Sequence, residues 1–148
     1  MECFYLEEQT VYSPQLYDTV CRLVGQLTRR PVGVDADLLQ NLIASENSHL
    51  LFLRQNSLVV GMATVGMYLS PTGRKAWIED LVVDEAFRGK KVGRKLMEEV
   101  MAFVRKSAPV TLMLTSKPAR VAANALYRSM GLEIKETNVY NQSVFLNK

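Results

Sequence analysis

The chain has 148 residues, enough for one domain but too few for two of full size. Hydrophobic residues make up 48% and charged residues 22%, which is typical of a folded globular protein and excludes a disordered chain. Eighteen Lys and Arg against fifteen Asp and Glu leave a formal net charge of +3, so the location of the excess matters more than its size. We therefore expect a single domain over residues 1–148.

Residues that bind metals or form disulfides are scarce. Cys3 and Cys21 are the only cysteines and His49 is the only histidine, which excludes a structural zinc site and gives no disulfide framework. Every apolar run is shorter than the roughly 20 residues that span a bilayer, and acidic residues stand where a secretion signal has a basic start. We expect a soluble cytoplasmic protein with reduced thiols, no metal and no membrane partner.

One strand and two helices are predicted in the first third of the chain. Phe4–Gln9 has the composition of a short strand. Ser13 is a suitable N-cap and Pro14 a suitable first residue for a helix that ends near residues 29–31, because apolar residues recur between them at helical spacing. Asp37 is expected to cap a second, shorter helix with one apolar stripe.

Extended segments follow in the middle of the chain. His49–Leu53 and Leu58–Leu69 are predicted to form two antiparallel strands joined by a polar turn. Residues 70–73, Ser-Pro-Thr-Gly, have strong turn chemistry and lead into a strand over Ala76–Val83. From Val92 onward the apolar residues recur at helical spacing, which predicts a third helix.

The last third of the chain is predicted to continue this alternation. Val110–Leu114 reads as a short buried strand, and Arg120–Met130 as a helix closed by Gly131 as its C-cap. Leu132–Lys135 and Ser143–Leu146 are expected to be closing strands. The order of elements predicts an α/β protein with a mixed sheet and helices packed on it.

The most informative segment lies between the strand that ends at Val83 and the helix that begins at Val92. A helix start leaves its first N–H groups without partners inside the helix, and glycines allow a ligand to approach the backbone closely. Five of eight residues are basic, in the run Arg88-Gly89-Lys90-Lys91-Val92-Gly93-Arg94-Lys95. The spacing excludes a Walker loop and a Rossmann turn. The alternative is a solvated, lysine-rich helix start, but the strand–loop–helix context favours a phosphate site.

Two segments resemble the GCN5-related N-acetyltransferase family. Its coenzyme motif, Arg/Gln-x-x-Gly-x-Gly/Ala after a strand, is matched from Arg88 to Gly93. Residues 122–132 are similar to the alanine-rich family helix that ends in Leu-Tyr-x-x-x-Gly-Phe. Lys91 replaces the first motif glycine and Leu132 replaces the phenylalanine. If the backbone at Lys91 needs a positive φ, this residue is strained and coenzyme A affinity is reduced.

The resemblance implies a fold and a reaction. The fold is a central, mostly antiparallel sheet flanked by helices, with two splayed central strands. The reaction is transfer of an acetyl group from acetyl-coenzyme A to a primary amine, by direct attack in a ternary complex. The residues that this assigns to coenzyme binding are Leu81, Val82, Val83, Arg88, Gly89, Lys90, Lys91, Val92, Gly93, Arg94, Asn124 and Tyr127.

Tyr127 and Glu79 are the candidate catalytic residues. Tyr127 stands at the family's tyrosine position, where its hydroxyl would protonate the departing thiolate. Glu79 would take the amine proton, and burial beside Trp77 and Leu81, on the same face by period two, would raise its pKa. Asp80 points to the opposite face in a regular strand, and either carboxylate is a candidate to face the acceptor. His49 is a poorer candidate base.

The acceptor is expected to be a small-molecule amine. Its specificity is expected to lie in three loops, over residues 29–37, 68–75 and 138–143. The pairs Arg29-Arg30 and Arg74-Lys75 favour an acceptor with a carboxylate or phosphate or are simply solvated, and Glu79 favours a cationic amine. A non-catalytic acyl-coenzyme A-binding module or sensor is the alternative function. Nucleic-acid binding through residues 88–95 is disfavoured because exposed aromatic residues are not interleaved there. The carboxy-terminal strands are also suited to forming a homodimer.

Overall fold

The computed structural model describes residues 3–31 and 33–146, and the chain divides into two compact units, Met1–Leu114 and Thr115–Lys148. A single domain over the whole chain therefore stays a prediction. Within the described ranges, every helix is too short or too polar to cross a membrane. The cytoplasmic location also stays a prediction.

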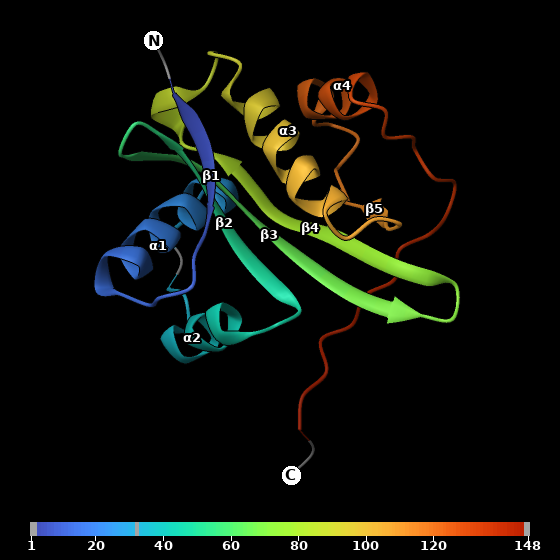
Figure 1. The fold of residues 1–148 in the computed structure, drawn as a ribbon, viewed down its shortest axis with the longest axis horizontal. Helices are drawn as coiled ribbons and strands as arrows, with labels where there is room; N and C mark the ends of the chain where they lie inside the picture. The colour runs from blue at the N-terminus through green and yellow to red at the C-terminus, as the bar shows by residue number, and fades with distance from the viewer. Residues whose placement is uncertain (1–2, 32, 147–148) are drawn as a thin grey trace. The chain divides into compact units, whose positions relative to one another are not determined.

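The first unit is built on one five-stranded sheet in the order β1-β2-β3-β4-β5 (Figure 1). Its strands are β1 (Phe4–Glu8), β2 (Ser48–Gln55), β3 (Leu58–Ser70), β4 (Gly73–Val83) and β5 (Thr111–Met113). The first four strands pair antiparallel and β5 joins β4 in parallel. This confirms the mixed, mostly antiparallel sheet that the sequence predicted.

Helices cover both faces of this sheet. Figure 1 shows α1 (Pro14–Thr28) and α2 (Ala36–Ala44) on one face and α3 (Val92–Arg105) on the other. On the first face, side chains of α1 and α2 form one buried cluster with residues of β2, β3 and β4: Leu16, Val20, Leu23, Leu39, Leu50, Phe52, Met62 and Val82. On the second face, Leu96 of α3 lies against Gly61. Because both faces are covered, all four residues 50–53 of β2 are buried.

The helix starts follow from short-range chemistry, with one correction. The Ser13 hydroxyl accepts a hydrogen bond from the Leu16 N–H at 3.0 Å, as expected. The second helix is capped by Asp35, whose carboxylate accepts from Asp37 N–H at 2.9 Å and Leu38 N–H at 3.1 Å. The assignment of the cap to Asp37 was wrong, because the helix already begins at Ala36 and Asp37 lies in its first turn.

The second unit contains one helix, α4 (Val121–Ser129), and no strand among its described residues. The helix ends as predicted: Gly131 has φ 92°, its N–H donates to the Arg128 carbonyl, and the Leu132 N–H donates to the Tyr127 carbonyl. The closing strands expected over 132–135 and 143–146 are wrong. A strand needs a neighbour for its backbone groups, and here Ile134 and Phe145 are 77% and 81% exposed.

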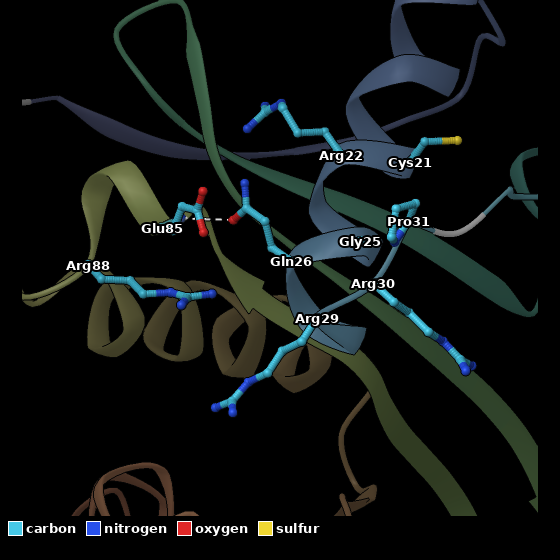
Figure 2. A pocket seen from close by; sticks show the side chains of 9 residues that line it. All are labelled: Cys21, Arg22, Gly25, Gln26, Arg29, Arg30, Pro31, Glu85 and Arg88. Atoms are coloured by element: carbon cyan, nitrogen blue, oxygen red, sulfur yellow. Dashed lines mark hydrogen bonds between the residues drawn. The ribbon is translucent and has the colours of Figure 1, made fainter.

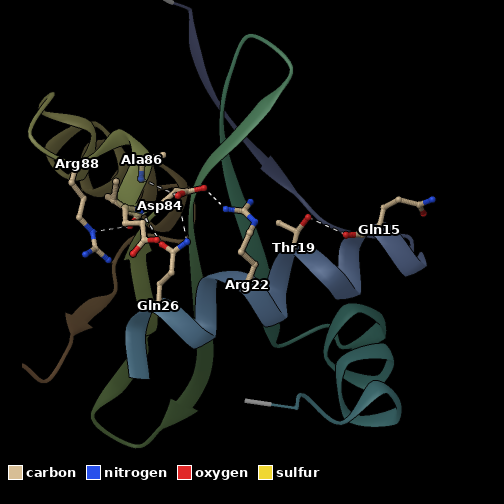
Figure 3. A network of polar contacts seen from close by, with 9 residues as sticks. Gln15, Thr19, Arg22, Gln26, Asp84, Ala86 and Arg88 are labelled. Carbon is tan, nitrogen blue, oxygen red and sulfur yellow. Dashed lines mark hydrogen bonds and ion pairs between the residues drawn. The ribbon is translucent and has the colours of Figure 1, made fainter. Parts of the chain in front are cut away.

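A buried carboxylate ties α1 to the end of β4 (Figure 3). Asp84 is only 7% exposed and forms an ion pair with Arg22. It also accepts hydrogen bonds from the Gln26 side chain at 3.4 Å and the Ala86 N–H at 3.1 Å. The side-chain amide oxygen of Gln26 in turn accepts a hydrogen bond from the Glu85 N–H at 2.8 Å. The residues that follow β4 are therefore held against the second half of α1.

The Asp84→Asn variant tests this connection. Burial raises the pKa of Asp84, but the hydrogen bond from Ala86 and the Arg22 guanidinium outweigh it and hold that pKa below its ordinary value. We expect the variant to lose about 2 kcal/mol of unfolding free energy at pH 7. A lowered folded pKa contributes stability above about pH 4, and this contribution disappears as the pH falls through the folded value. The loss should therefore shrink at pH 3 in urea titrations.

The matched control is Asp18→Asn, which changes an exposed aspartate of the same helix α1. It should change the unfolding free energy by less than about 0.5 kcal/mol at either pH. Equal effects of the two variants would show that the Asp84 contacts do not stabilise the fold.

Candidate active site

The loop between β4 and α3 has the backbone of an anion site. A short 3-10 turn, Glu85–Phe87, follows the strand, and Gly89 and Lys91 then have φ of 81° and 62°. Helix α3 begins at Val92, and no side chain caps it. Its first N–H groups therefore point out of the helix without a side-chain acceptor, and a bound phosphate would take that place.

Lys91 occupies the position where the sequence pattern has glycine, and the structure meets the condition for strain. At φ 62° and ψ 19° its backbone is left-handed, which costs a residue with a Cβ atom about 1 kcal/mol. The lysine keeps its charge beside the helix start at the expense of backbone strain.

Two of the five basic side chains in residues 88–95 form ion pairs with acids of the same helix. Arg94 Nε lies 3.2 Å from Glu98 and Lys95 Nζ lies 2.9 Å from Glu99, each one helical turn further along α3. Residues 88–95 contain no acid, but the following turn supplies two. These pairs reduce the long-range field of the segment, which further disfavours nucleic-acid binding.

The other basic side chains stay with the loop itself. Arg88 Nε donates to the Val83 carbonyl at 3.2 Å, so its guanidinium is held at the end of β4. Lys90 Nζ lies 5.9 Å from the centre of the Phe87 ring. Together with Lys91, these groups concentrate positive charge at the start of α3.

Strand β4 is interrupted by a bulge at its centre. One β3 residue, Ala63, lies opposite two β4 residues, Asp80 and Leu81, because the register shifts between the flanking pairs. Asp80 has φ 51°, the left-handed backbone that such an extra residue adopts. The expectation that Glu79 and Leu81 share a face by period two is therefore wrong: one additional residue reverses the alternation.

Glu79 lies on the sheet face that α1 covers. It is directly opposite Thr64, which is opposite Leu50, and directly opposed residues share a face. Leu50 belongs to the cluster that packs against α1. Glu79 itself is exposed, so the burial expected from the sequence is not found.

Two aromatic residues extend this face beyond Glu79. Trp77 lies on the same face two residues earlier, and its indole N–H donates to the Tyr68 hydroxyl at 3.3 Å. Gly66 is directly opposite Trp77, and a Cβ atom added there would meet nothing within 4 Å. In the sequence, only the period-two spacing of Trp77 and Glu79 indicated this surface. Nothing in the sequence indicated that Gly66 lies opposite Trp77.

The sheet opens along the other edge of β4. Strand β5 pairs with β4 only at residues 75–77, and the ladder ends at Trp77. Beyond it, β5 offers no hydrogen-bonding partner to the backbone of Leu81, Val82 and Val83. Because β5 is the edge strand of the described sheet, the ladder opens between β4 and an edge strand, and the splaying of two central strands that the resemblance implied stays a prediction.

His49 lies away from Glu79. It pairs with Val65, on the face that α3 covers, where its ring meets Phe103 edge-on at 5.3 Å. Its Nδ1 is 2.6 Å from a Glu8 carboxylate oxygen. These contacts give His49 a packing role on the opposite face of the sheet.

In the second unit, Tyr127 is the buried residue of α4, at 7% exposure. Burial raises its pKa, and the charge of Arg120 opposes that rise only in part, so the hydroxyl stays protonated at neutral pH. Asn124, one turn earlier, donates to the Lys117 carbonyl at 3.0 Å. Its amide thus orders the loop that leads into the helix.

Across the residues that the structure describes, no group of three or more His, Cys, Asp or Glu side chains is placed to hold a metal ion.

The chain is similar to known acetyltransferases. Residues 16–132 match the model of the acetyltransferase (GNAT) family. The N-alpha-acetyltransferase RimI of Mycobacterium tuberculosis is 29% identical over 91 residues, which are 62% of this chain and 56% of that protein. The chain thus matches about half the length of this curated relative.

Solved structures share the fold. An aminoglycoside acetyltransferase from an uncultured soil metagenomic sample has a TM-score of 0.80 at 17% identity, over 97% of this chain and 99% of that chain. A second such enzyme from an uncultured soil metagenomic sample, in complex with sisomicin, has a TM-score of 0.77 at 17% identity, over 96% of each chain. At these identities the likeness shows the fold alone.

The Lys91→Gly variant tests the strain at the start of α3. Glycine adopts a positive φ freely, although its unfolded chain is more flexible, so we expect a net gain of about 0.5–1 kcal/mol in unfolding free energy. Lys91→Ala is the control, because it removes the charge and keeps the Cβ atom. It should leave the stability nearly unchanged in urea titrations. An equal gain from alanine would assign the cost to the charge.

Proposed function

Because the chain belongs to the GNAT family of acetyltransferases, we propose that it transfers the acetyl group of acetyl-coenzyme A to a primary amine by direct attack in a ternary complex. One observation carries this proposal. Strand β4 presents the exposed Glu79, then a bulge and an open edge, and the loop that follows it leads to the uncapped start of α3. A single element thus offers groups for the acceptor, the pantetheine arm and the phosphates.

The donor is held mainly by the backbone. N–H groups at the start of α3, between Lys91 and Arg94, bind the pyrophosphate, and Arg88 and Lys90 add charge. The open edge of β4 at residues 81–83 receives the pantetheine arm, as the family resemblance implies. Gly89 allows close approach, since a Cβ atom there would meet nothing within 4 Å. Asn124 and Tyr127 are assigned to the coenzyme by resemblance alone.

The chemical step begins at the amine. Glu79 takes a proton from the ammonium form, directly or through a water, and the free amine attacks the thioester carbonyl. The C–N bond forms, and backbone N–H groups of β4 stabilise the developing oxyanion. Glu79 is favoured over Asp80 because it lies on the face of Trp77 and Thr64, whereas Asp80 is the extra residue of the bulge.

The step ends at sulfur. As the C–S bond breaks, the Tyr127 hydroxyl donates its proton to the departing thiolate. Support comes from its position in the family motif and from its raised pKa, which keeps the proton in place until it is needed. The second proton of the attacking nitrogen passes to solvent as the amide forms, solvent reprotonates Tyr127, and no acyl-enzyme forms.

We further propose that the acceptor is a small molecule with a primary amine. Support comes from the similar proteins, which include an N-alpha-acetyltransferase and aminoglycoside acetyltransferases. The exposed Tyr68 and the half-buried Trp77 and Gly66 form an aromatic surface on the face of Glu79. Homodimer formation stays a prediction.

The first experiment is calorimetry with acetyl-coenzyme A, followed by thiol release over a panel of amines. Binding together with release supports the proposal. Binding without release from any amine would instead support the non-catalytic acyl-coenzyme A module, and no binding at high micromolar ligand would exclude both.

The Tyr127→Phe variant tests the proton donor. Removing the hydroxyl should lower kcat by about 100-fold, the usual contribution of a general acid. Coenzyme affinity should change less than about two-fold, since the ring still fills its buried position. Tyr5→Phe, at an exposed tyrosine of β1, is the control and should leave kcat unchanged. Unchanged turnover in Tyr127→Phe would remove the assigned role.

The pair Glu79→Gln and Asp80→Asn decides between the two carboxylates. We expect Glu79→Gln to lower kcat/KM about 100-fold near neutral pH. Part of the activity should return at higher pH, because the free amine fraction of the acceptor then rises without help. Asp80→Asn should lower kcat/KM by less than about three-fold, and its pH profile should follow that of the unmodified chain. The reverse pattern would make Asp80 the base.

A further inference from the structure

A cavity of about 770 Å³ lies between the second half of α1 and the segment that follows β4 (Figure 2). Its volume is within the range of about 300–1,000 Å³ that small-molecule sites occupy. Of its lining residues, the proposed reaction uses only Arg88. The lining is Cys21, Arg22, Gly25, Gln26, Arg29, Arg30, Pro31, Glu85 and Arg88.

The cavity is strongly and unevenly charged. The lining residues include four arginines and a single acid, Glu85. Arg22 is neutralised by Asp84. In the described ranges, Arg29 and Arg30 form no ion pair, and Arg88 donates only to a backbone carbonyl. Three uncompensated arginines against Glu85 leave a net charge of about +2, which favours an anion in this space.

Two of the uncompensated cations, Arg29 at the end of α1 and Arg88 after β4, extend into the same part of the cavity. One face of α1 carries Arg22 and Gln26, which are four residues apart, and Arg29 continues that face at the end of the helix, three residues further on. Figure 2 shows Arg29 and Arg88 extending to the same side, whereas Arg30 points the other way.

The base of the cavity is fixed. The Gln26 side chain accepts from the Glu85 N–H at 2.8 Å, which joins the two walls. Arg29 has φ 57° as the cap of α1, and this left-handed turn directs the chain out of the helix.

We propose that this cavity binds a carboxylate or phosphate group of the amine acceptor, held by Arg29. The inference deepens the proposed function and rests on it. Guanidinium groups bind both anions through paired N–H···O bonds. The cavity and Glu79 lie on the side of the sheet that α1 covers, and Glu85 of the cavity lining follows Glu79 by six positions in the chain. Six residues span at most about 20 Å, so the acceptor carries its anion on a spacer from its amine.

The test uses matched acceptors that differ only in the anion. Lysine is compared with cadaverine for the carboxylate, and pyridoxamine 5′-phosphate with pyridoxamine for the phosphate. Thiol release gives kcat/KM for each. We expect the chain to prefer the anionic member of at least one pair by about ten-fold, and the pair that responds identifies the anion.

Arg29→Gln should abolish this preference while leaving kcat/KM for the neutral or cationic partner within two-fold. Arg29→Lys should keep part of the preference, because it retains a charge without the planar fork. The matched control is Arg105→Gln, an exposed arginine in the last turn of α3, which should keep all of it.

Two results would overturn the inference and leave the proposed function standing. One is equal kcat/KM within both pairs in the unmodified chain. The other is a rise in the Kd for acetyl-coenzyme A in Arg29→Gln with the acceptor preference intact, which would assign the cavity to a coenzyme phosphate. Absence of both acetyl-coenzyme A binding and thiol release would remove the proposed function, and the inference with it.

Discussion

The buried carboxylate of Asp84 is the contact on which the rest of the site depends. It joins Arg22 and Gln26 of α1 to the Ala86 N–H after β4, although Arg22 lies 62 positions away in the sequence. Removing a charge from water is costly, and here charged and neutral donors together offset that cost. The basic loop that follows β4 therefore starts from a fixed point, and the arginine-lined cavity has one stable wall on each side.

The bulge divides β4 into two segments, to which we assign different parts of the proposed reaction. Before it, Glu79 and Trp77 lie on the face that α1 covers; at the bulge, Asp80 takes a left-handed backbone and the alternation shifts. After it, Val82 returns to the core cluster on the α1 side. Since β5 leaves β4 after Trp77, the bulged segment is also the segment with a free edge. Amine chemistry and thioester binding can thus share one strand without competing for one side chain.

The net charge that each segment of this molecule presents depends on ion pairing as much as on composition. Arg94 and Lys95 are matched by acids one turn along α3, so the segment with most basic residues is partly neutralised. Arg29 and Arg30 attract little attention in the sequence as two loop charges, yet they join Arg88 around one cavity. The sequence left open whether Arg29 and Arg30 are solvated or bind an anion, because the partners of a charge depend on the fold.

The sequence by itself determined what depends on neighbours along the chain. Ser13 and Gly131 act at helix ends within one turn of themselves, the apolar periods produced the strands and helices, and the coenzyme motif indicated the family. Only the tertiary structure decided that Asp35 caps α2, that β4 is bulged at Asp80, and that residues 132–146 lack strand partners. It also brought Arg29 to Arg88 across 59 positions. The Asp35 cap is a local contact with the N–H groups of Asp37 and Leu38, and only its position in the sequence was misjudged. The other features arise from contacts between distant segments, and a one-residue change of register leaves the composition and the local pattern of a strand unchanged.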